Sequence, residues 1–286
     1  MRREWSALLV VFVAAGAMST VAQIPIFSVK REEVRIDVLV TDHGKPVPGL
    51  TSTDFEVLDN GVPQQIEFAS SEAISIDAIL TLDMSASVAG ELLDHLRSAG
   101  HVLLDGLRKD DRAALVTFSH VVALGSTLTS DLGRVKAALD SVQPFGDTSL
   151  IDASYAGLIV GKTDFGCPLV IVFSDGLDTS SWLTGDAVLD TAKRSDAVVY
   201  AVSAGRLPNM TFLRDLTGLT GGSLFEVEST NNLSAVFLSI LEEFRQRYLV
   251  TYEPRGVSKG GWHRLEVRVK GRKVTVKARP GYLIGS

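Results

Sequence analysis

The residues best suited to chemistry are Asp83, Ser85 and Ser87, which stand at alternate positions after the strand-like, mostly apolar run 76–82. A carboxylate and two hydroxyls that follow a buried strand can converge on one hard cation that takes oxygen ligands. The cluster holds no imidazole or thiol, which favours Mg²⁺, Mn²⁺ or Ca²⁺ over zinc or copper. The alternative is a capped turn, because Asp and Ser often cap the helix after a strand.

Two later residues, Thr148 and Asp175, could complete such a site. Thr148 lies in the loop 146–149 before an expected helix, and Asp175 ends the next buried run, 169–173. In an open α/β sheet, ligands gather outside the carboxyl ends of the strands. All three loops can therefore meet at one edge of a sheet.

The middle of the chain alternates strand and helix patterns, which predicts a doubly wound, mostly parallel sheet of the α/β class. Buried strands are expected over residues 78–82, 114–118, 169–173 and 197–202. Helices are expected over residues 91–107, 131–141, 149–160, 184–194, 209–217 and 233–247.

Both ends of the chain have β patterns instead. Strands are expected over residues 34–41, 55–58, 65–68, 248–252, 265–269 and 274–276, and Asp59-Asn60-Gly61 is a hairpin signal. Each end alone has too few strands to bury a face. We therefore expect a small β-sandwich-like domain formed by residues 23–72 and 248–286, with the α/β domain inserted over residues 73–247.

The order Asp83-x-Ser85-x-Ser87, Thr148, Asp175 resembles the von Willebrand factor A domain (VWFA) and its metal-ion-dependent adhesion site (MIDAS). The resemblance spans residue 75 to about residue 247. It implies that these five residues hold one divalent cation, Mg²⁺ first and Mn²⁺ or Ca²⁺ as alternatives, and that the two carboxylates often act through waters. The flanks, such as Arg279-Pro280-Gly281-Tyr282, look like those of secreted bacterial VWFA-related proteins.

Two positions depart from the family pattern. Ala86 replaces the usual Gly between the serines, which we expect to be a mild change, and Asp147 replaces a Gly commonly found before the threonine. An extra carboxylate at Asp147 could enter the coordination shell or raise the affinity for a divalent ion through its charge. Near the site, Asp152 and Asp178 are interpreted as structural or solvated, and Trp182 as a packing residue with partner contact as the alternative.

The amino terminus and the overall charge suggest location and partners. Residues 1–22 have the basic start, short apolar stretch and small closing residues of a cleaved signal peptide, which predicts a secreted or periplasmic protein without a membrane span after cleavage. The chain has 28 basic and 34 acidic side chains; without Arg2, Arg3 and Glu4 these become 26 and 33, a net charge of −7. That charge argues against nucleic acid as a partner. Cys167 is the single cysteine, which excludes an internal disulfide and is read as a buried core residue.

These features predict a non-enzymatic, adhesion-type protein that captures an exposed Asp or Glu of a protein partner through the cation. A structural envelope protein with a purely stabilising metal site is the first alternative. A metal-dependent hydrolase with Asp83 as base is the second, and it would need another acid-base group, for which Asp147 is the candidate. We expect no nucleophile elbow, and the chain has neither a His-Glu-x-x-His motif nor a P-loop.

Overall fold

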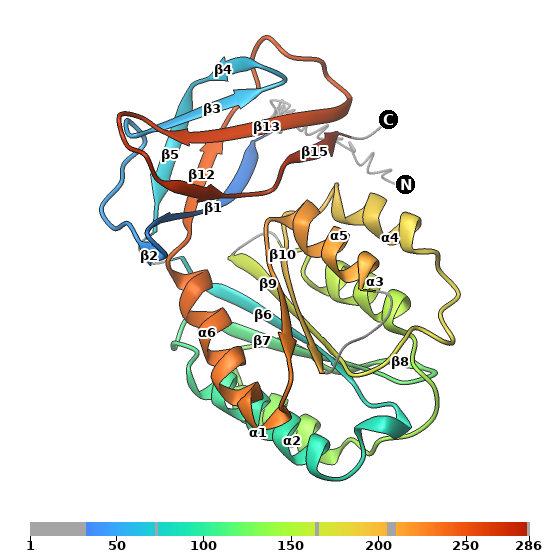
Figure 1. Cartoon of the computed structure of the whole chain (residues 1–286). Helices are drawn as coiled ribbons and strands as arrows, with labels where there is room; N and C mark the ends of the chain where they lie inside the picture. The colour runs from blue at the N-terminus through green and yellow to red at the C-terminus, as the bar shows by residue number, and fades with distance from the viewer. Residues whose placement is uncertain (1–32, 72–73, 164–165, 205–209, 285–286) are drawn as a thin grey trace, which may run out of the picture. The chain divides into compact units, whose positions relative to one another are not determined.

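The computed structural model describes residues 33–71, 74–163, 166–204 and 210–284 (Figure 1). The expected signal peptide, residues 1–22, lies outside these ranges. Within them, no helix is both long and apolar enough to cross a bilayer.

The largest sheet has six strands, and all neighbours are parallel except the last pair. In spatial order the strands are β11 (Leu224–Val227), β10 (Val198–Ala204), β9 (Cys167–Ser174), β6 (Ile76–Asp83), β7 (Arg112–Phe118) and β8 (Val122–Thr129). Every residue of β6 and β9 is buried. Burial on both faces explains why these strands read as nearly continuous apolar runs.

Helices cover both faces of this sheet (Figure 1). One face is covered by α1 (Glu91–Asp105), α2 (Leu132–Ser141) and α6 (Leu233–Arg245), and the other by α3 (Leu150–Val160), α4 (Gly185–Ala192) and α5 (Thr211–Thr220). Side chains alternate across a strand, so Leu80 and Leu82 pack on the first face and Ile79 on the second. The chain thus has the α/β fold that the alternating pattern predicts, and Cys167 is buried in the first of these cores.

The four buried strands and six helices expected from the sequence are present, whereas β8 and β11 were not expected. β8 is an edge strand that runs antiparallel to β7, with register shifts and mostly exposed residues. Its sequence, VALGSTLT, shows no regular alternation of apolar and polar residues, because most side chains of this edge strand are at least partly exposed. β11 has only four residues, which is too short for a periodic signal.

Two smaller sheets combine strands from before β6 and after α6, and we call them together the β frame. One has the order β14 (Thr275–Lys277), β1 (Val34–Asp42), β12 (Tyr248–Tyr252), β5 (Ile66–Ser70), with β2 (Lys45–Pro46) also paired to β1. The other has the order β15 (Gly281–Ile284), β13 (Gly261–Val269), β3 (Phe55–Asp59), β4 (Val62–Gln64). Apolar residues of both sheets form one core.

The β frame differs from the sequence expectation in its number of strands and in one connection, since β2, β4 and β15 were not expected. The Asn60-Gly61 turn does form a hairpin, but its second strand is the short β4, and β5 pairs with β12 in the other sheet. The chain changes sheets between Gln64 and Ile66, so sequence proximity did not predict the pairing.

A buried polar group holds the β frame together. Asp59 is fully buried, and its Oδ2 accepts hydrogen bonds from the hydroxyls of Tyr252 (2.8 Å) and Tyr282 (2.7 Å). Its Oδ1 lies 2.8 Å from Nδ1 of His263, which is also fully buried. The four residues come from β3, β12, β15 and β13, so one carboxylate links both sheets. Burial raises the pKa of both tyrosines, which keeps them neutral donors.

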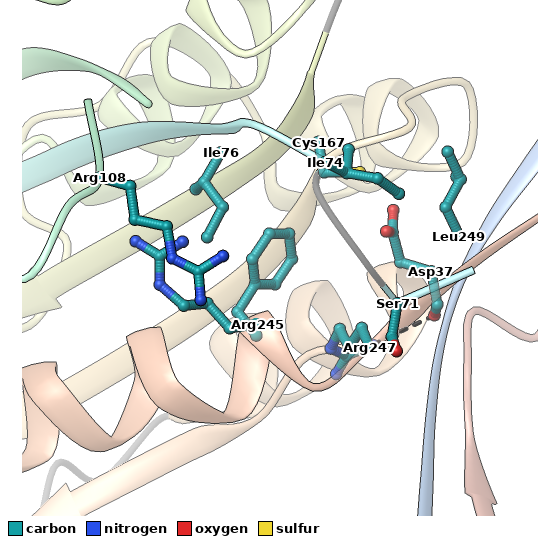
Figure 2. A pocket seen from close by; sticks show the side chains of 10 residues that line it. Asp37, Ser71, Ile74, Ile76, Arg108, Cys167, Arg245, Arg247 and Leu249 are labelled. Atoms are coloured by element: carbon teal, nitrogen blue, oxygen red, sulfur yellow. Dashed lines mark hydrogen bonds between the residues drawn. The ribbon is translucent and has the colours of Figure 1, made fainter. Parts of the chain in front are cut away.

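Arg247 joins the β frame to the six-stranded sheet. Its guanidinium donates to the Gly221 carbonyl (2.6 Å), to the Tyr200 hydroxyl (3.0 Å) and to the Asp37 carbonyl (3.2 Å). Beside it lies a cavity of about 30 Å³, into which the Asp37 side chain faces (Figure 2). A cavity of this size holds little more than a water molecule, so it is no ligand site.

Asp37, a half-buried residue of β1, makes stability depend on pH through its carboxyl group. Burial raises its pKa, and Arg247 only partly offsets this. A raised pKa in the folded state means that the folded chain keeps its proton longer than the unfolded chain. The free energy of unfolding therefore falls as pH rises through this window. In urea unfolding with chelator present, Asp37→Asn should reduce the fall in the free energy of unfolding that begins as pH rises above about 4, the ordinary pKa of an aspartate.

Asp42→Asn is the matched control, because this carboxylate lies at the exposed end of the same strand. An Asp37→Asn variant whose pH dependence equals that of the wild type would show that Asp37 is not effectively buried.

Removal of residues 248–286 should make the chain aggregate. This deletion takes away β12, which lies between β1 and β5, and leaves two open strand edges beside an uncovered apolar core. Size-exclusion chromatography with light scattering would measure the association. A truncated chain that stays monomeric and melts at the wild-type temperature would contradict the shared frame.

Candidate metal centre

The structure brings the five predicted site residues to the carboxyl edge of the six-stranded sheet. Asp83 ends β6, Ser85 and Ser87 follow it, Asp175 follows β9, and Thr148 precedes α3. The Ser87 hydroxyl donates to Asp175 Oδ1 at 2.9 Å, and the Ser85 and Ser87 hydroxyls lie 3.1 Å apart.

Thr148 joins this group from the side of Gly176. A Cβ atom placed on Gly176 would lie 3.4 Å from Thr148 Oγ1, which shows that the two residues are neighbours. Among the described residues, no hydrogen bond of Thr148 Oγ1 is found, and the residue is 6% exposed. A nearly buried hydroxyl that is left for another partner suits a ligand position.

The spacing of these oxygens fits a small divalent cation. Magnesium binds oxygen at about 2.1 Å in octahedral geometry, which puts neighbouring ligand oxygens about 3.0 Å apart. The separations of 3.1 Å for Ser85–Ser87 and 2.9 Å for Ser87–Asp175 match this value. The donor set of carboxylates and hydroxyls is also of the right chemical kind. No cluster of three or more His, Cys, Asp and Glu occurs in the described ranges, so a metal site there depends on hydroxyl ligands.

Asp83 is the most buried member of the site. It is fully buried, its Oδ1 accepts from the Ser85 amide at 2.9 Å, and its Oδ2 accepts from the Ser174 hydroxyl at 2.7 Å. These bonds fix the carboxylate and leave its remaining lone pairs for a cation or a bridging water.

Without a cation, the surroundings of Asp83 and Asp175 disfavour the ionised form of both carboxyl groups. Burial raises the pKa of Asp83, and the neighbouring charge of Asp175 adds to that rise. Burial also raises the pKa of Asp175, against the effect of the Ser87 hydrogen bond. A bound cation reverses this balance because it favours both ionised carboxylates.

The backbone around Thr148 is fixed by the loop after β9. The Thr148 amide donates to Thr179 Oγ1 (3.1 Å), and its carbonyl accepts from the amides of Thr179 (2.8 Å) and Ser180 (3.1 Å). On the other side, the Ala86 amide donates to the Gly146 carbonyl (2.9 Å). The three loops are therefore tied to one another by main-chain bonds, which holds the ligand oxygens in place.

The two departures from the family pattern have different outcomes. Ala86 has no positive φ, so an alanine fits there without backbone strain, as expected. Asp147 is exposed and makes no hydrogen bond or ion pair with any described residue. The structure thus gives no contact by which Asp147 acts on the other five residues.

The neighbouring acidic residues are structural, as expected. Asp152 Oδ2 and Oδ1 accept from the amides of Trp182 and Leu183, each at 2.9 Å. Asp178 Oδ1 accepts from the Ile151 amide at 3.2 Å. The interpretation of Trp182 as a packing residue is wrong, because the residue is 94% exposed. The exposure of Trp182 could not be predicted from the sequence pattern, because it depends on how the loop between β9 and α4 lies against α3.

No nucleophile elbow was expected, but the chain does contain the pattern Gly-x-Ser-x-Gly at residues 256–260. They lie in the loop between β12 and β13 and lack the strand–turn–helix setting of a nucleophile elbow. The Ser258 hydroxyl lies 3.3 Å from His263 Nε2 and also 3.1 Å from the Gly260 carbonyl. Because His263 belongs to the polar group centred on Asp59, we assign this contact to the stability of the β frame.

Comparisons with known proteins agree with the geometry. Residues 78–177 match the family model of the von Willebrand factor type A domain. A structure of proximal thread matrix protein 1 from the mussel byssus, with a zinc-occupied MIDAS motif, is 18% identical with a TM-score of 0.55 and covers 65% of this chain and 49% of that one. A von Willebrand factor type A protein from Catenulispora acidiphila is 13% identical with a TM-score of 0.55, covering 80% and 73%.

These structural similarities establish the fold alone, because the identities are low. The chain spans about half the length of the mussel protein. An aerotolerance-related membrane protein from Bacteroides fragilis is also similar, at 16% identity and a TM-score of 0.50, with 60% of this chain and 99% of that one covered. A search of curated proteins found no match.

A double substitution tests the metal centre. Ser85→Ala with Asp175→Ala removes one hydroxyl and one carboxylate from a site whose ligands come from three loops. Calorimetry with MgCl₂ should show one site in the wild type and none in the variant, while the far-UV circular dichroism stays unchanged. Ser239→Ala, at an exposed position of α6, is the control. Metal affinity that is the same in the double variant would refute the assignment.

Proposed function

Because residues 78–177 form a von Willebrand factor type A domain, we propose that the chain is a non-enzymatic protein that binds a protein partner through a divalent cation. The proposed ligands are Asp83, Ser85, Ser87, Thr148 and Asp175. The observation that supports this most is the closeness of the Ser85, Ser87 and Asp175 oxygens, at separations typical of ligands around one small cation.

The ligand set leaves a cation able to take one more oxygen. Three of the five ligands are neutral hydroxyls, so only Asp83 and Asp175 offset its charge. When bound, the ion supplies a coordination position for an Asp or Glu oxygen of the partner. Ser87 is exposed and Asp175 is half-buried, whereas Asp83 is fully buried. The partner therefore approaches from the side of Ser87 and Asp175.

The oxygen donor set favours Mg²⁺, with Mn²⁺ and Ca²⁺ as alternatives. Zinc is a further candidate, because a mussel protein of the same fold has a zinc-occupied MIDAS motif. Zinc belongs in the metal titration for this reason.

We also propose that the chain works outside the cytoplasm, after removal of residues 1–22, and that residues 23–72 and 248–286 form one β-sandwich-like domain. The common core of the two smaller sheets supports the second part. In this proposal the β frame holds the α/β domain at both of its ends, through β6 and α6, and presents the metal centre to a partner.

The hydrolase alternative lacks support from the geometry. It needs a second acid-base group at the site, and the side chain of Asp147, the candidate, is exposed and makes no hydrogen bond or ion pair with a described residue. A purely stabilising metal is the alternative that the binding experiment decides.

Selection from a displayed library of random linear peptides tests the proposal. With MgCl₂ present, the full chain should enrich peptides that share one Asp or Glu, and EDTA should release them. Thr148→Ala should weaken binding of an enriched peptide about tenfold or more, because a ligand is lost, while the melting temperature changes little. Thr127→Ala, on the exposed edge strand β8, is the control.

Binding that survives excess EDTA, or an enriched pool without an acidic residue, would show that the metal only stabilises the loops. Exchange of the shared Asp for Asn in the peptide should abolish binding if the carboxylate reaches the ion.

A further inference from the structure

A groove with apolar walls lies directly beside the metal centre, and we call it the Trp182 groove. It has a volume of about 500 Å³, and its walls include Val121, Ser149, Tyr155, Trp182 and Leu183. Val121 lies in the turn between β7 and β8. Ser149 directly precedes α3, and Tyr155 lies within it. Trp182 and Leu183 lie in the loop between β9 and α4. Groove volumes in this range accept a large side chain or a small ligand.

The groove lies next to the loops of the metal centre: His120, which lines it, packs against Gly146, whose carbonyl accepts from the Ala86 amide. Thr148, a proposed ligand, is followed in the chain by Ser149, which lines the groove. The Ser149 hydroxyl lies 2.8 Å from that of Ser180, next to the residues that bind the Thr148 backbone. One set of hydrogen bonds therefore fixes both the ligand position and one wall of the groove.

Trp182 is held in position without being packed. Its amide donates to Asp152 Oδ2 at 2.9 Å, and the Leu183 amide donates to Oδ1 of the same carboxylate at 2.9 Å. The residue is nevertheless 94% exposed, and Val121 across the groove is 58% exposed. Exposed tryptophan on a fixed backbone is typical of an interface residue, since it loses little conformational freedom on binding.

Charge decides which side chain fits the groove. Both oxygens of Asp152, the one carboxylate that lines it, already accept main-chain hydrogen bonds, and the lining residues include no Lys or Arg. The Asp152 charge disfavours a second carboxylate there, and His120 is the one lining side chain that could pair with it, whereas the metal centre suits an acidic group. The two neighbouring sites thus accept side chains of opposite character.

We propose that the partner is an extended polypeptide segment in which a large apolar side chain stands within about two residues of the metal-binding Asp or Glu and fills the Trp182 groove. Consecutive residues of an extended segment advance by about 3.3 Å, and the ligand Thr148 and the groove residue Ser149 are neighbours in the chain. This inference rests on the proposed function and names the kind of partner that the same site takes.

The same peptide selection tests it with one further variant. Peptides enriched by the wild-type chain with MgCl₂ should carry Leu, Ile, Phe, Tyr or Trp within two residues of the shared acidic residue. Trp182→Ser should weaken the best peptide about tenfold or more and should remove the apolar preference from a new selection. Its Mg²⁺ affinity and melting temperature should equal those of the wild type, because the side chain packs against little.

Phe68→Ser is the matched control, since Phe68 is a similarly exposed aromatic residue on β5 of the β frame, 46% exposed. Metal-dependent enrichment of an acidic residue without an apolar neighbour, or unchanged peptide affinity in Trp182→Ser, overturns this inference and leaves the proposed function intact. The absence of any metal-dependent enrichment overturns both.

Discussion

The parallel pairing of β6 with β9 is the constraint on which the candidate site depends. In its register Leu82 lies opposite Phe173, so the next residues, Asp83 and Ser174, leave the sheet side by side. The Ser174 hydroxyl then reaches Asp83 Oδ2 at 2.7 Å, and Asp175 follows close enough to accept from Ser87. A shift of one residue in this register would turn the side chains of a strand to the opposite face and separate the two carboxylates.

The β frame and the α/β domain share more than a covalent connection. Only Gln246 and Arg247 separate the end of α6 from the start of β12, and Arg247 binds backbone or hydroxyl groups of β1, β10 and the turn after α5. Since α6 packs along α1, which follows the Asp83–Ser87 segment, the frame and the metal-site loop contact the same helix pair.

The sequence predicted the features whose cause is local. Buried strands such as 169–173 and helices such as 91–107 follow from apolar patterns. Four of the five site residues follow from oxygen-bearing residues placed just after such strands, and Thr148 from its place in a loop before a helix. The structure joins Ser85, Ser87 and Asp175 at hydrogen-bond distances and places Thr148 beside Gly176, and that the five residues hold a cation stays a prediction. The strand β5 was assigned to the wrong partner and β8 was missed, because edge strands and sheet changes depend on contacts between segments far apart in sequence. The exposure of Trp182 could not be predicted either, since it results from two main-chain bonds to Asp152 on another element.

The two raised carboxyl pKa values link metal binding to stability. Keeping Asp83 and Asp175 ionised and close together in a buried site lowers the stability of the metal-free fold. A cation that binds only the folded chain stabilises it in proportion to the logarithm of its concentration over the dissociation constant. The order of the three loops and the affinity for the ion are therefore coupled, and the same coupling reaches the Trp182 groove through the main-chain bonds of Thr148 to Thr179 and Ser180. The loops that would bind the ion also fix the wall against which a partner would pack, so metal affinity and partner affinity are expected to rise together.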